Sequence, residues 1–490
     1  MARRVLIPRL EILSKDEIYD IHLATLQVLE RTGVKVNDPK ALEMLRDAGA
    51  TVDSKTSVVK IPEHLLKDEI RKAPNYFALY GRNTSYKLRF ERGRTYFSSQ
   101  GTSAFVVDFE TGKRRKAALK DVKSFFVLSD ALENIHHASM AVWPSDVPEA
   151  VAYAYVLLEG FRNATKTLDG YNYGERIAID NIEIASVVAG GREELRKNPR
   201  LLGFVNPVSP LEHSKEMTQG LRVFAEYKQP TLIAPEAQAG STAPVTLAGL
   251  LVQQNAEVLS GILISQLVQP GAPVLYGTAS CIADMKTGNI ALGAIETGLI
   301  NIATAQIAEY YGLPSRGTGG ATNSKSSDIQ AGFEKGLTLS MAAMAGINFI
   351  YDAAGLLEAS RTASLEQMVI DNDLCGMVLR ALRGVEVDEE TMGVEVINGV
   401  GPGGHYLSQK HTRDFFRSEH YVPKILNREL WEVWQKTGSK ELASIAHVKT
   451  EKILREHVVE PLDKSLEAEL EGLIKEICRR QKSFQNRYFK

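Results

Sequence analysis

The fold is decided by the sequence YGTASCIADMKTGNIALGAIETGLINIATAQIAEYYGLPSRGTGGATNSKSSDIQA, which covers residues 276–331. It predicts a strand, a polar glycine-rich loop, a long helix, a second strand and a second glycine-rich loop without a break. Small and polar residues follow each apolar run, at 277–280 and at 316–324. Parallel barrels build their active sites on the loops that follow strands. We therefore expect these loops, and not the helices, to carry the function.

The same alternation extends over residues 102–354. Strand-like runs occur at 103–108, 138–143, 165–170, 201–206, 230–235, 273–277, 313–317 and 348–352. Helical patterns occur at 150–161, 176–190, 214–227, 243–267, 291–311 and 328–345. This pattern predicts an α/β protein with a closed (β/α)8 TIM barrel. An open doubly wound sheet is the alternative, but no GxGxxG sequence follows the first run.

The predicted barrel is flanked by two extensions. Residues 1–101 predict an N-terminal extension of helices and strands, whose first helix begins at a capping box, Ser14 to Glu17, and ends at Gly33. Residues 355–490 predict a C-terminal, mostly helical extension that packs on the barrel. We interpret its last amphipathic helix, 466–485, as an element that wraps the surface.

The composition is that of a globular protein. The 490 residues are 44% hydrophobic and 24% charged, with a formal net charge of -2, so no strong field attracts nucleic acid or an anionic membrane. No uninterrupted apolar run reaches the ~20 residues that span a bilayer. Only three apolar residues in a row precede Pro8, too few for a signal peptide. We expect a cytoplasmic protein whose partners are small molecules and proteins.

The cysteines give no sign of a disulfide framework or a metal centre. Cys281, Cys375 and Cys478 are far apart in the sequence and odd in number, which fits a reducing compartment. No CxxC or HExxH zinc pattern is present. The sequence therefore predicts no metal site.

Four motifs carry a family resemblance. They are the run 206–211 (NPVSPL), the run 233–249 with QQNAE at 253–257, the segment 319–335, and GPGGH at 401–405. In this order they resemble the trimethylamine methyltransferase family over nearly the whole chain. The resemblance implies a TIM barrel that moves a methyl group from a methylated amine to the cobalt of a separate corrinoid protein. The chain lacks a DxHxxG sequence, so we expect the corrinoid to be carried by that partner and not bound tightly here.

One departure from the family bears on the substrate. Founding members insert pyrrolysine in the barrel, whereas every residue here is one of the ordinary twenty and the segment 318–334 is continuous. The resemblance implies that pyrrolysine prepares trimethylamine for methyl transfer. A quaternary ammonium already carries a permanent positive charge and leaves as a neutral tertiary amine. We therefore expect a quaternary amine, glycine betaine or a related betaine, as characterised members without pyrrolysine use.

A quaternary ammonium binds best between aromatic faces. The aromatic candidates lie near the ends of predicted strands: Phe97, Trp143, Tyr171, Tyr276 and Tyr351. For each of them, packing within the barrel or a loop is the competing interpretation. Trp143, one of three tryptophans, is the best single candidate.

Polar residues at the strand ends complete the predicted substrate site. Arg316 and the amides of its loop are candidates for the carboxylate of a betaine, and an ion pair with Asp328 or Glu358 is the equally weighted alternative. Glu236 is a candidate to face the ammonium, or else to fix a loop, and Asp352 is similar. The remaining candidates are amides that either contact substrate or brace loops: Gln100, Asn206, Gln238 and Asn323.

The glycine-rich loop 401–406 has a different predicted role. Its flexible backbone is suited to closing over the barrel mouth or to approaching the partner's macrocycle, so Gly403, Gly404 and His405 are the predicted corrinoid contacts. A structural, hydrogen-bonded histidine is the alternative interpretation.

Two alternative functions stay open. One is a non-catalytic betaine-binding or sensing module. The other is a TIM-barrel methyltransferase for a thiol or methoxy donor, which would need zinc ligands among Cys281, Cys375 and the histidines. The sequence does not distinguish glycine betaine from carnitine or proline betaine, and a homo-oligomer is possible.

Overall fold

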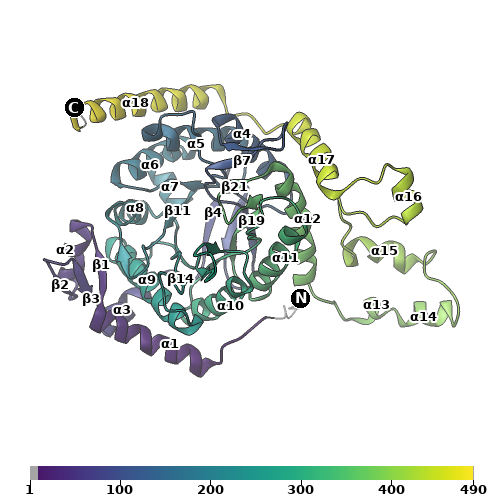
Figure 1. Ribbon diagram of the computed structural model, residues 1–490, viewed down its shortest axis with the longest axis horizontal. Helices are drawn as coiled ribbons and strands as arrows, with labels where there is room; N and C mark the ends of the chain where they lie inside the picture. The colour runs from purple at the N-terminus through teal and green to yellow at the C-terminus, as the bar shows by residue number, and fades with distance from the viewer. Residues whose placement is uncertain (1–8, 489–490) are drawn as a thin grey trace.

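The computed structural model describes residues 9–488 and contains a closed barrel of parallel strands (Figure 1). Each strand pairs with the next one along the chain, and the last pairs with the first. The barrel strands are β6 (Tyr96–Ser99), β9 (His137–Ala138), β10 (Thr167–Gly170), β11 (Leu201–Val205), β13 (Thr231–Ile233), β15 (Val274–Gly277), β18 (Ser315–Thr318) and β19 (Phe349–Ala354). The predicted (β/α)8 barrel is confirmed.

The predicted first strand is wrong. The run 103–108 contains β7 (Phe105–Val107), which lies outside the barrel between β8 (Arg114–Lys116) and β21 (Thr362–Ala363), next to β20 (Leu356–Leu357). The barrel position belongs to β6, so the barrel begins before residue 102. Its sequence, YFSS, is less strand-like than FVV at 105–107, and periodicity cannot tell which of two neighbouring strands enters a barrel.

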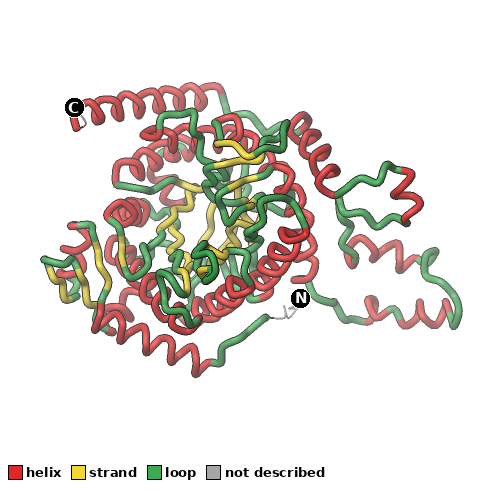
Figure 2. Tube along the Cα trace, viewed as in Figure 1, coloured by secondary structure: helices red, strands yellow, loops and turns green. Residues whose placement is uncertain are grey.

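Helices surround the barrel strands on all sides (Figures 1 and 2). They are α4 (Leu119–Ala131), α5 (Glu149–Asn163), α6 (Glu175–Ala189), α7 (Arg192–Lys197), α8 (Lys215–Glu226), α9 (Leu247–Val268), α10 (Ile295–Tyr310), α11 (Ile329–Met344) and α12 (Leu365–Leu382). All predicted helical patterns correspond to one of these. Helix α8 packs closely against β11 at Gly203. Only glycine fits at this position, because a Cβ there would lie 2.6 Å from the Phe224 ring.

Helix α9 is apolar throughout most of its length. Within residues 9–488 it alone is long and apolar enough to cross a membrane by length and composition, and 72% of its most apolar window is buried in the protein. Its burial is that of a core helix in the barrel wall.

The N-terminal extension closes the end of the barrel at which the amino ends of the strands lie. The hairpin of β4 (Phe77–Tyr80) and β5 (Lys87–Phe90) places Phe77, Leu79, Leu88 and Phe90 in one apolar cluster with barrel residues such as Phe349. Because this apolar cluster fills one end of the barrel, the carboxyl ends of the strands form the open end.

The rest of the extension packs on the barrel wall. Helix α1 (Lys15–Gln27) begins at the predicted capping box, and the π turn η1 (Val28–Thr32) ends at Gly33, with φ of 78°. A small sheet follows, in which β1 pairs with β12 from a barrel loop. In this sheet β1 is Val34–Val36 and β12 is Glu212–His213. The other elements of the extension are α2 (Pro39–Asp47), β2 (Thr51–Asp53), β3 (Val58–Lys60) and α3 (Glu63–Ile70).

The C-terminal region divides into an arm and two packed helices. The arm, which we define as residues 385–440, projects sideways from the barrel (Figures 1 and 2). It contains α13 (Glu389–Met392), α14 (Val394–Val400), α15 (Lys410–Glu419) and α16 (Trp431–Lys436). Helix α17 (Leu442–Glu456) then packs on α12 and α4, and α18 (Lys464–Tyr488) lies along α5 and α6.

Candidate active site

A cavity of about 260 Å³ lies at the carboxyl ends of the barrel strands. Every barrel strand, or the loop that follows it, contributes to the lining. The lining residues, taken strand by strand, include Gly101, Met140, Tyr171, Phe204, Asn206, Glu236, Ala279, Arg316, Thr318, Tyr351 and Asp352. Of the predicted site residues, the cavity brings together Tyr171, Asn206, Glu236, Arg316, Tyr351 and Asp352.

Four aromatic residues line the cavity: Tyr171, Tyr173, Phe204 and Tyr351. The ring centroids of Phe204 and Tyr351 are 4.8 Å apart, and Tyr171 stands on the loop after β10. Trp143 packs behind Tyr171 with ring centroids 4.9 Å apart, so it supports the wall. Such an arrangement presents π faces to a cation.

The loop that carries Tyr171 is held by close packing against α8. A Cβ at Gly220 would lie 1.5 Å from the carbonyl oxygen of Asn172, so only glycine fits there. The side-chain oxygen of Asn172 accepts a hydrogen bond of 3.0 Å from the Phe204 backbone N–H. Two of the aromatic walls are thereby tied to each other.

Arg316 lies fully buried beneath the cavity. Its Nη1 donates to the Thr318 hydroxyl at 2.9 Å and to the carbonyl of Thr278, while its guanidinium carbon lies 5.1 Å from the Tyr351 ring centroid. Its Nε has no hydrogen-bond partner among residues 9–488. Burial lowers the pKa of Arg316, and the negative charge of Asp352 opposes that shift most strongly.

Asp328 and Glu358, the alternative partners predicted for Arg316, do not pair with it. Asp328 instead caps α11 by accepting from the backbone N–H of Ala331 at 2.9 Å. Glu358 pairs with Arg114 at 2.9 Å. The guanidinium therefore belongs to the cavity and not to a bridge under the loop.

Two carboxylates lie beside the guanidinium. Asp352 accepts the Gly101 N–H at 3.1 Å, and Glu236 accepts from the Asn206 amide at 3.0 Å. Glu236 has surface open to the cavity but is surrounded by protein, and desolvation raises its pKa. Arg316 lowers that pKa again, whereas Asp352 raises it further. Burial likewise raises the pKa of Asp352, with Arg316 as the main opposing charge.

A bulge in β19 explains why Tyr351 and Asp352 both line the cavity. Adjacent residues of a regular strand point to opposite faces. Here the register shifts between Ile350 and Ala354, and Asp352 has φ of 66°. A bulge redirects a side chain in this way, so one strand supplies both an aromatic ring and a carboxylate.

A buried polar network holds Tyr351 from below. Its hydroxyl donates to Asp169 Oδ2 at 3.1 Å, and Asp169 Oδ1 lies 2.7 Å from His137 Nε2. His137 Nδ1 lies 2.8 Å from the Thr167 hydroxyl, and Met140 N donates to Asp169. Sequence reasoning missed this network; the only signal was charged and polar residues within two barrel strands, where they are rare.

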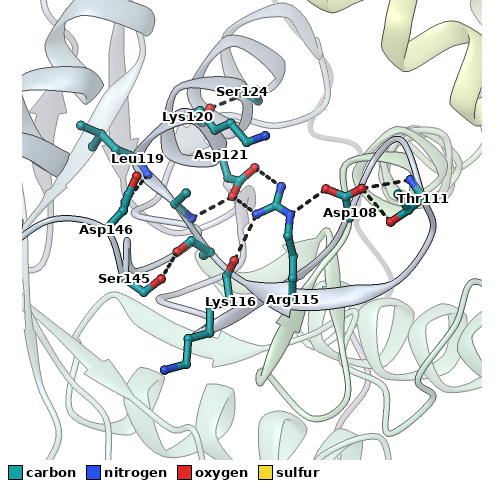
Figure 3. Close-up of polar contacts among 12 residues, drawn as sticks. Asp108, Thr111, Arg115, Lys116, Leu119, Lys120, Asp121, Ser124, Ser145 and Asp146 are labelled. Atoms are coloured by element: carbon teal, nitrogen blue, oxygen red, sulfur yellow. Dashed lines mark hydrogen bonds and ion pairs between the residues drawn. The ribbon is translucent and has the colours of Figure 1, made fainter.

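The loop after β9, which carries Met140 and Trp143, is fixed by a second network (Figure 3). Arg115 bridges Asp108 and Asp121, with contacts of 2.6 Å to each. Further along, Asp146 accepts the Leu119 N–H at 2.9 Å. The β7–β8 hairpin outside the barrel therefore has a structural role beside the site.

The remaining predicted site residues do not line the cavity. Phe97 and Tyr276 point outward to the helices, where the Tyr276 hydroxyl donates to Asn255 at 2.9 Å. Gln100 is buried beside Gly355, and its side-chain amide has no partner in the described part of the chain.

Gln238 and Asn323 brace loops. The carbonyl of Gln238 accepts three backbone N–H groups, including that of Ser241 at 3.0 Å. The Asn323 amide accepts from Gly293 N and donates to the Ile290 carbonyl, each at 2.8 Å. The predicted corrinoid contacts Gly403, Gly404 and His405 lie in the arm between α14 and α15, exposed and outside the cavity lining.

The cysteines are not grouped for metal binding. Between residues 9 and 488 no group of three or more His, Cys, Asp or Glu side chains is placed to hold a metal ion. Cys281 and Cys375 are buried, and burial raises the pKa of the Cys281 thiol to about 12. A zinc-thiolate site, which needs deprotonated cysteines, gains no support from this arrangement.

Comparison with known proteins gives matches over nearly the whole chain. The family described as trimethylamine methyltransferase (MTTB) matches residues 2–484. A glycine betaine methyltransferase of Desulfitobacterium hafniense (strain Y51) is 35% identical over 470 residues, covering 96% of this chain and 97% of that protein. The trimethylamine methyltransferase MttB of Methanosarcina barkeri (strain Fusaro / DSM 804) is 37% identical, covering 95% and 94%.

The fold is also similar to a solved structure. The crystal structure of the hydroxylamine MtmB complex superposes with a TM-score of 0.50 at 13% sequence identity, covering 93% of this chain and 97% of that one. At this level of identity the likeness concerns the fold alone.

Proposed function

The chain belongs to the trimethylamine methyltransferase family and is a methyltransferase for methylated amines, and we propose that its methyl donor is a quaternary amine of the betaine class. We further propose that the methyl acceptor is the Co(I) corrinoid of a separate protein, and that both act in the cytoplasm.

The charge balance of the cavity carries this proposal. Glu236 and Asp352 bring two carboxylates beside the single guanidinium of Arg316. Desolvation raises the pKa of both carboxyls, so a bound cation would favour their ionised forms. A quaternary ammonium between these groups and the aromatic walls supplies the missing positive charge and makes cation–π contacts.

Arg316 suits the other end of a betaine. Its buried Nε–H lacks a partner in the described structure, and a guanidinium binds carboxylates through directed, charge-assisted hydrogen bonds. A betaine would then lie with its carboxylate toward Arg316 and its methyl groups toward the aromatic rings. Trimethylamine has no carboxylate for Arg316 to bind.

The chemical step requires positioning more than acid–base catalysis. The acceptor supplies the electron pair for the new bond to methyl carbon, and the nitrogen keeps the pair of the broken C–N bond. The quaternary ammonium thereby becomes a neutral tertiary amine, and no proton moves. The residues of this chain hold the cation dry and aim one methyl group at the open mouth. The buried His137–Asp169–Tyr351 network fixes a ring and need not transfer a proton.

The mouth of the barrel fits a transient macromolecular partner. Exposed apolar side chains stand on the loops that follow β10, β11, β13 and β15: Tyr173, Val208, Val245 and Met285. Met285 and Val245 are neighbours across Gly240. Apolar residues at such a rim are suited to a protein that presents a flat macrocycle.

An anaerobic methylation assay tests the proposal. The full-length protein is mixed with a Co(I) corrinoid, free or on candidate corrinoid proteins, and methyl-Co(III) is followed by its visible spectrum. Separate reactions contain glycine betaine, proline betaine, carnitine and trimethylamine. We expect methylation with one or more betaines and not with trimethylamine. Methylation from trimethylamine alone would overturn the substrate class.

Binding without turnover would point to a different function. If isothermal titration detects a betaine but no donor is demethylated with any corrinoid protein, the chain is a binding or sensing module. If neither binding nor turnover is found, the betaine proposal fails altogether.

A further inference from the structure

Two glycines line the cavity at the barrel mouth, and they differ in what their missing side chains make room for. Gly101 follows β6, and Gly170 ends β10. A Cβ at Gly170 would lie 2.8 Å from the Phe224 ring and 2.9 Å from the Cβ of Leu201, so this glycine serves the packing of the barrel wall. A Cβ at Gly101 would instead meet a ring that lines the cavity.

The Cα of Gly101 packs directly against the ring of Tyr351. An added Cβ would lie 2.8 Å from Cε1, 2.9 Å from the hydroxyl oxygen and 3.3 Å from Cζ of that ring. Non-bonded carbon atoms prefer separations of about 3.5–4.0 Å, so an alanine and the ring cannot both keep these places. The φ angle of Gly101 lies outside the left-handed region. Space, and not backbone conformation, therefore requires glycine here.

The Tyr351 ring is held by neighbours on its other sides. Its hydroxyl donates to Asp169 Oδ2 at 3.1 Å. The ring centroids of Phe204 and Phe349 lie 4.8 Å and 6.0 Å from that of Tyr351. The cavity is the unfilled space beside the ring, and packed side chains yield little. A methyl group at Gly101 would therefore press the ring into the cavity and reduce the space for a ligand.

The backbone of Gly101 has a separate role that an alanine would keep. Its N–H donates to Asp352 Oδ1 at 3.1 Å. Burial raises the pKa of Asp352, and the charge of Arg316 and this hydrogen bond oppose the rise. Because alanine retains the N–H, a substitution at this position changes the volume of the cavity while the carboxylate keeps its donor.

We propose that Gly101 determines which ammonium head groups the cavity accepts, because its missing side chain leaves room for the Tyr351 ring and thereby for a fully methylated ammonium. This inference rests on the proposed quaternary-amine donor. Gly101 acts through Tyr351 and is therefore a positioning residue. A ring pressed inward removes the volume that a fourth substituent on nitrogen requires, whereas an ammonium with fewer methyl groups still fits.

The test is a comparison of two cations that carry the same charge, tetramethylammonium and dimethylammonium. Their binding to the full-length wild type and to Gly101→Ala is measured by isothermal titration calorimetry. We expect the affinity for tetramethylammonium to fall roughly 5- to 100-fold, the effect of an overpacked site. The affinity for dimethylammonium should fall by less than about threefold. Equal changes in the two affinities, or no change in either, would overturn the proposal.

A second comparison asks whether the effect passes through the ring. In Tyr351→Leu the side chain is too short to contain the ring atoms that an added Cβ would meet. Adding Gly101→Ala to that variant should change the affinity for tetramethylammonium by less than about threefold, since the two substitutions are coupled. A loss as large as in the wild-type background would show that the ring does not mediate the effect.

The same pair of variants covers a failure to fold. If Gly101→Ala does not fold and the double variant with Tyr351→Leu does, the clash with the ring is confirmed. If neither folds, glycine is needed by the backbone alone and the proposal fails.

Gly298→Ala is the matched control for crowding elsewhere. A Cβ at Gly298 on α10 would lie 2.7 Å from Cε of Met341 on α11, in the outer layer of helices. This variant should leave both affinities unchanged. If it shifts the preference between the two cations as Gly101→Ala does, the effect is not specific to the cavity and the proposal fails.

The wild type separates this inference from the proposed function. A wild type that binds neither tetramethylammonium nor any betaine would refute the quaternary-amine donor, and the inference would fall with it. A wild type that binds them, with Gly101→Ala binding both cations equally well, would refute the role of Gly101 alone.

Discussion

The Lys335–Asp371 pair and the charged groups around Arg316 are both buried, but their hydrogen bonds are completed differently. Lys335 donates to Asp371 and to the Gly320 carbonyl, and Asp371 also accepts from Gly355 N at 2.8 Å and Gln367 at 2.8 Å. Arg316 keeps an unpartnered Nε, and its carboxylate neighbours face a cavity. Lys335 and Asp371 are hydrogen-bonded within the protein and join α11 to α12. The charged groups around Arg316 retain hydrogen-bonding capacity that a ligand can use.

We expect the largest effect from a substitution that breaks the buried Lys335–Asp371 pair. Lys335→Met leaves Asp371 buried without its counter-charge, and removing one partner of a buried pair costs about 3–5 kcal/mol. We expect a loss of that size in the free energy of unfolding, measured with urea. The double variant Lys335→Met/Asp371→Leu is the control and should recover most of it, since a paired apolar replacement is tolerated. A loss below about 1 kcal/mol would contradict a structural role for the pair.

The second prediction separates charge from geometry at Arg316. Arg316→Lys keeps the charge but loses the planar set of donors. A hydrogen bond to a charged group contributes about 1.5–3 kcal/mol, so kcat/KM for glycine betaine should fall by roughly 10- to 150-fold. Binding of tetramethylammonium, which has no carboxylate, should change little. Equal losses for both ligands would mean that Arg316 does not recognise the carboxylate.

The third prediction concerns pH. Ionised Glu236 and Asp352 attract the cation, and burial raises the pKa of both carboxyls. The affinity for the cation should therefore be highest above these raised pKa values, where both carboxyls are ionised. It should fall as the pH drops through them, and this fall should occur at a higher pH than the titration of exposed carboxyls. Glu236→Gln should weaken tetramethylammonium binding by about tenfold, or ~1.4 kcal/mol, and flatten the dependence. Calorimetric titration between pH 8 and 5 measures both, and an unchanged pH profile in the variant would exclude Glu236 as the titrating group.

The smallest effect tests the network beneath Tyr351. Tyr351→Phe keeps the ring and removes only the hydroxyl that binds Asp169, so betaine affinity should fall about fivefold or less. Tyr351→Leu removes the π face and should cost several times more, because a desolvated cation–π contact contributes ~2 kcal/mol. If the two variants lose affinity equally, the ring does not contact the cation.

Much of the fold was predictable because strand and helix periodicity is local. Seven strand runs and all six helical patterns correspond to elements of the barrel. The first barrel strand was not predictable in this way, because β6 and β7 lie close together in the sequence. Only the closure of the barrel decides that β19 pairs with β6 and not with β7.

The site was predictable in part. Residues near strand ends reach the cavity when their side chains point to the inside of the barrel, as do those of Arg316 within β18 and Glu236 in the loop after β13. Tyr276 is also at a strand end but points to the helices, because a shift of one residue moves a side chain to the other face. Asp169 and His137 lie 32 residues apart, and no local pattern joins them.

The sequence by itself determined the barrel, the family and the loops that carry the polar residues, because these follow from local periodicity and from motifs in a fixed order. Only the tertiary structure decided which of those residues share one cavity, how the bulge at Asp352 brings a carboxylate beside the Tyr351 ring, and which apolar surfaces stay uncovered. These features depend on register, closure and packing between distant segments, which are set when the chain folds as a whole.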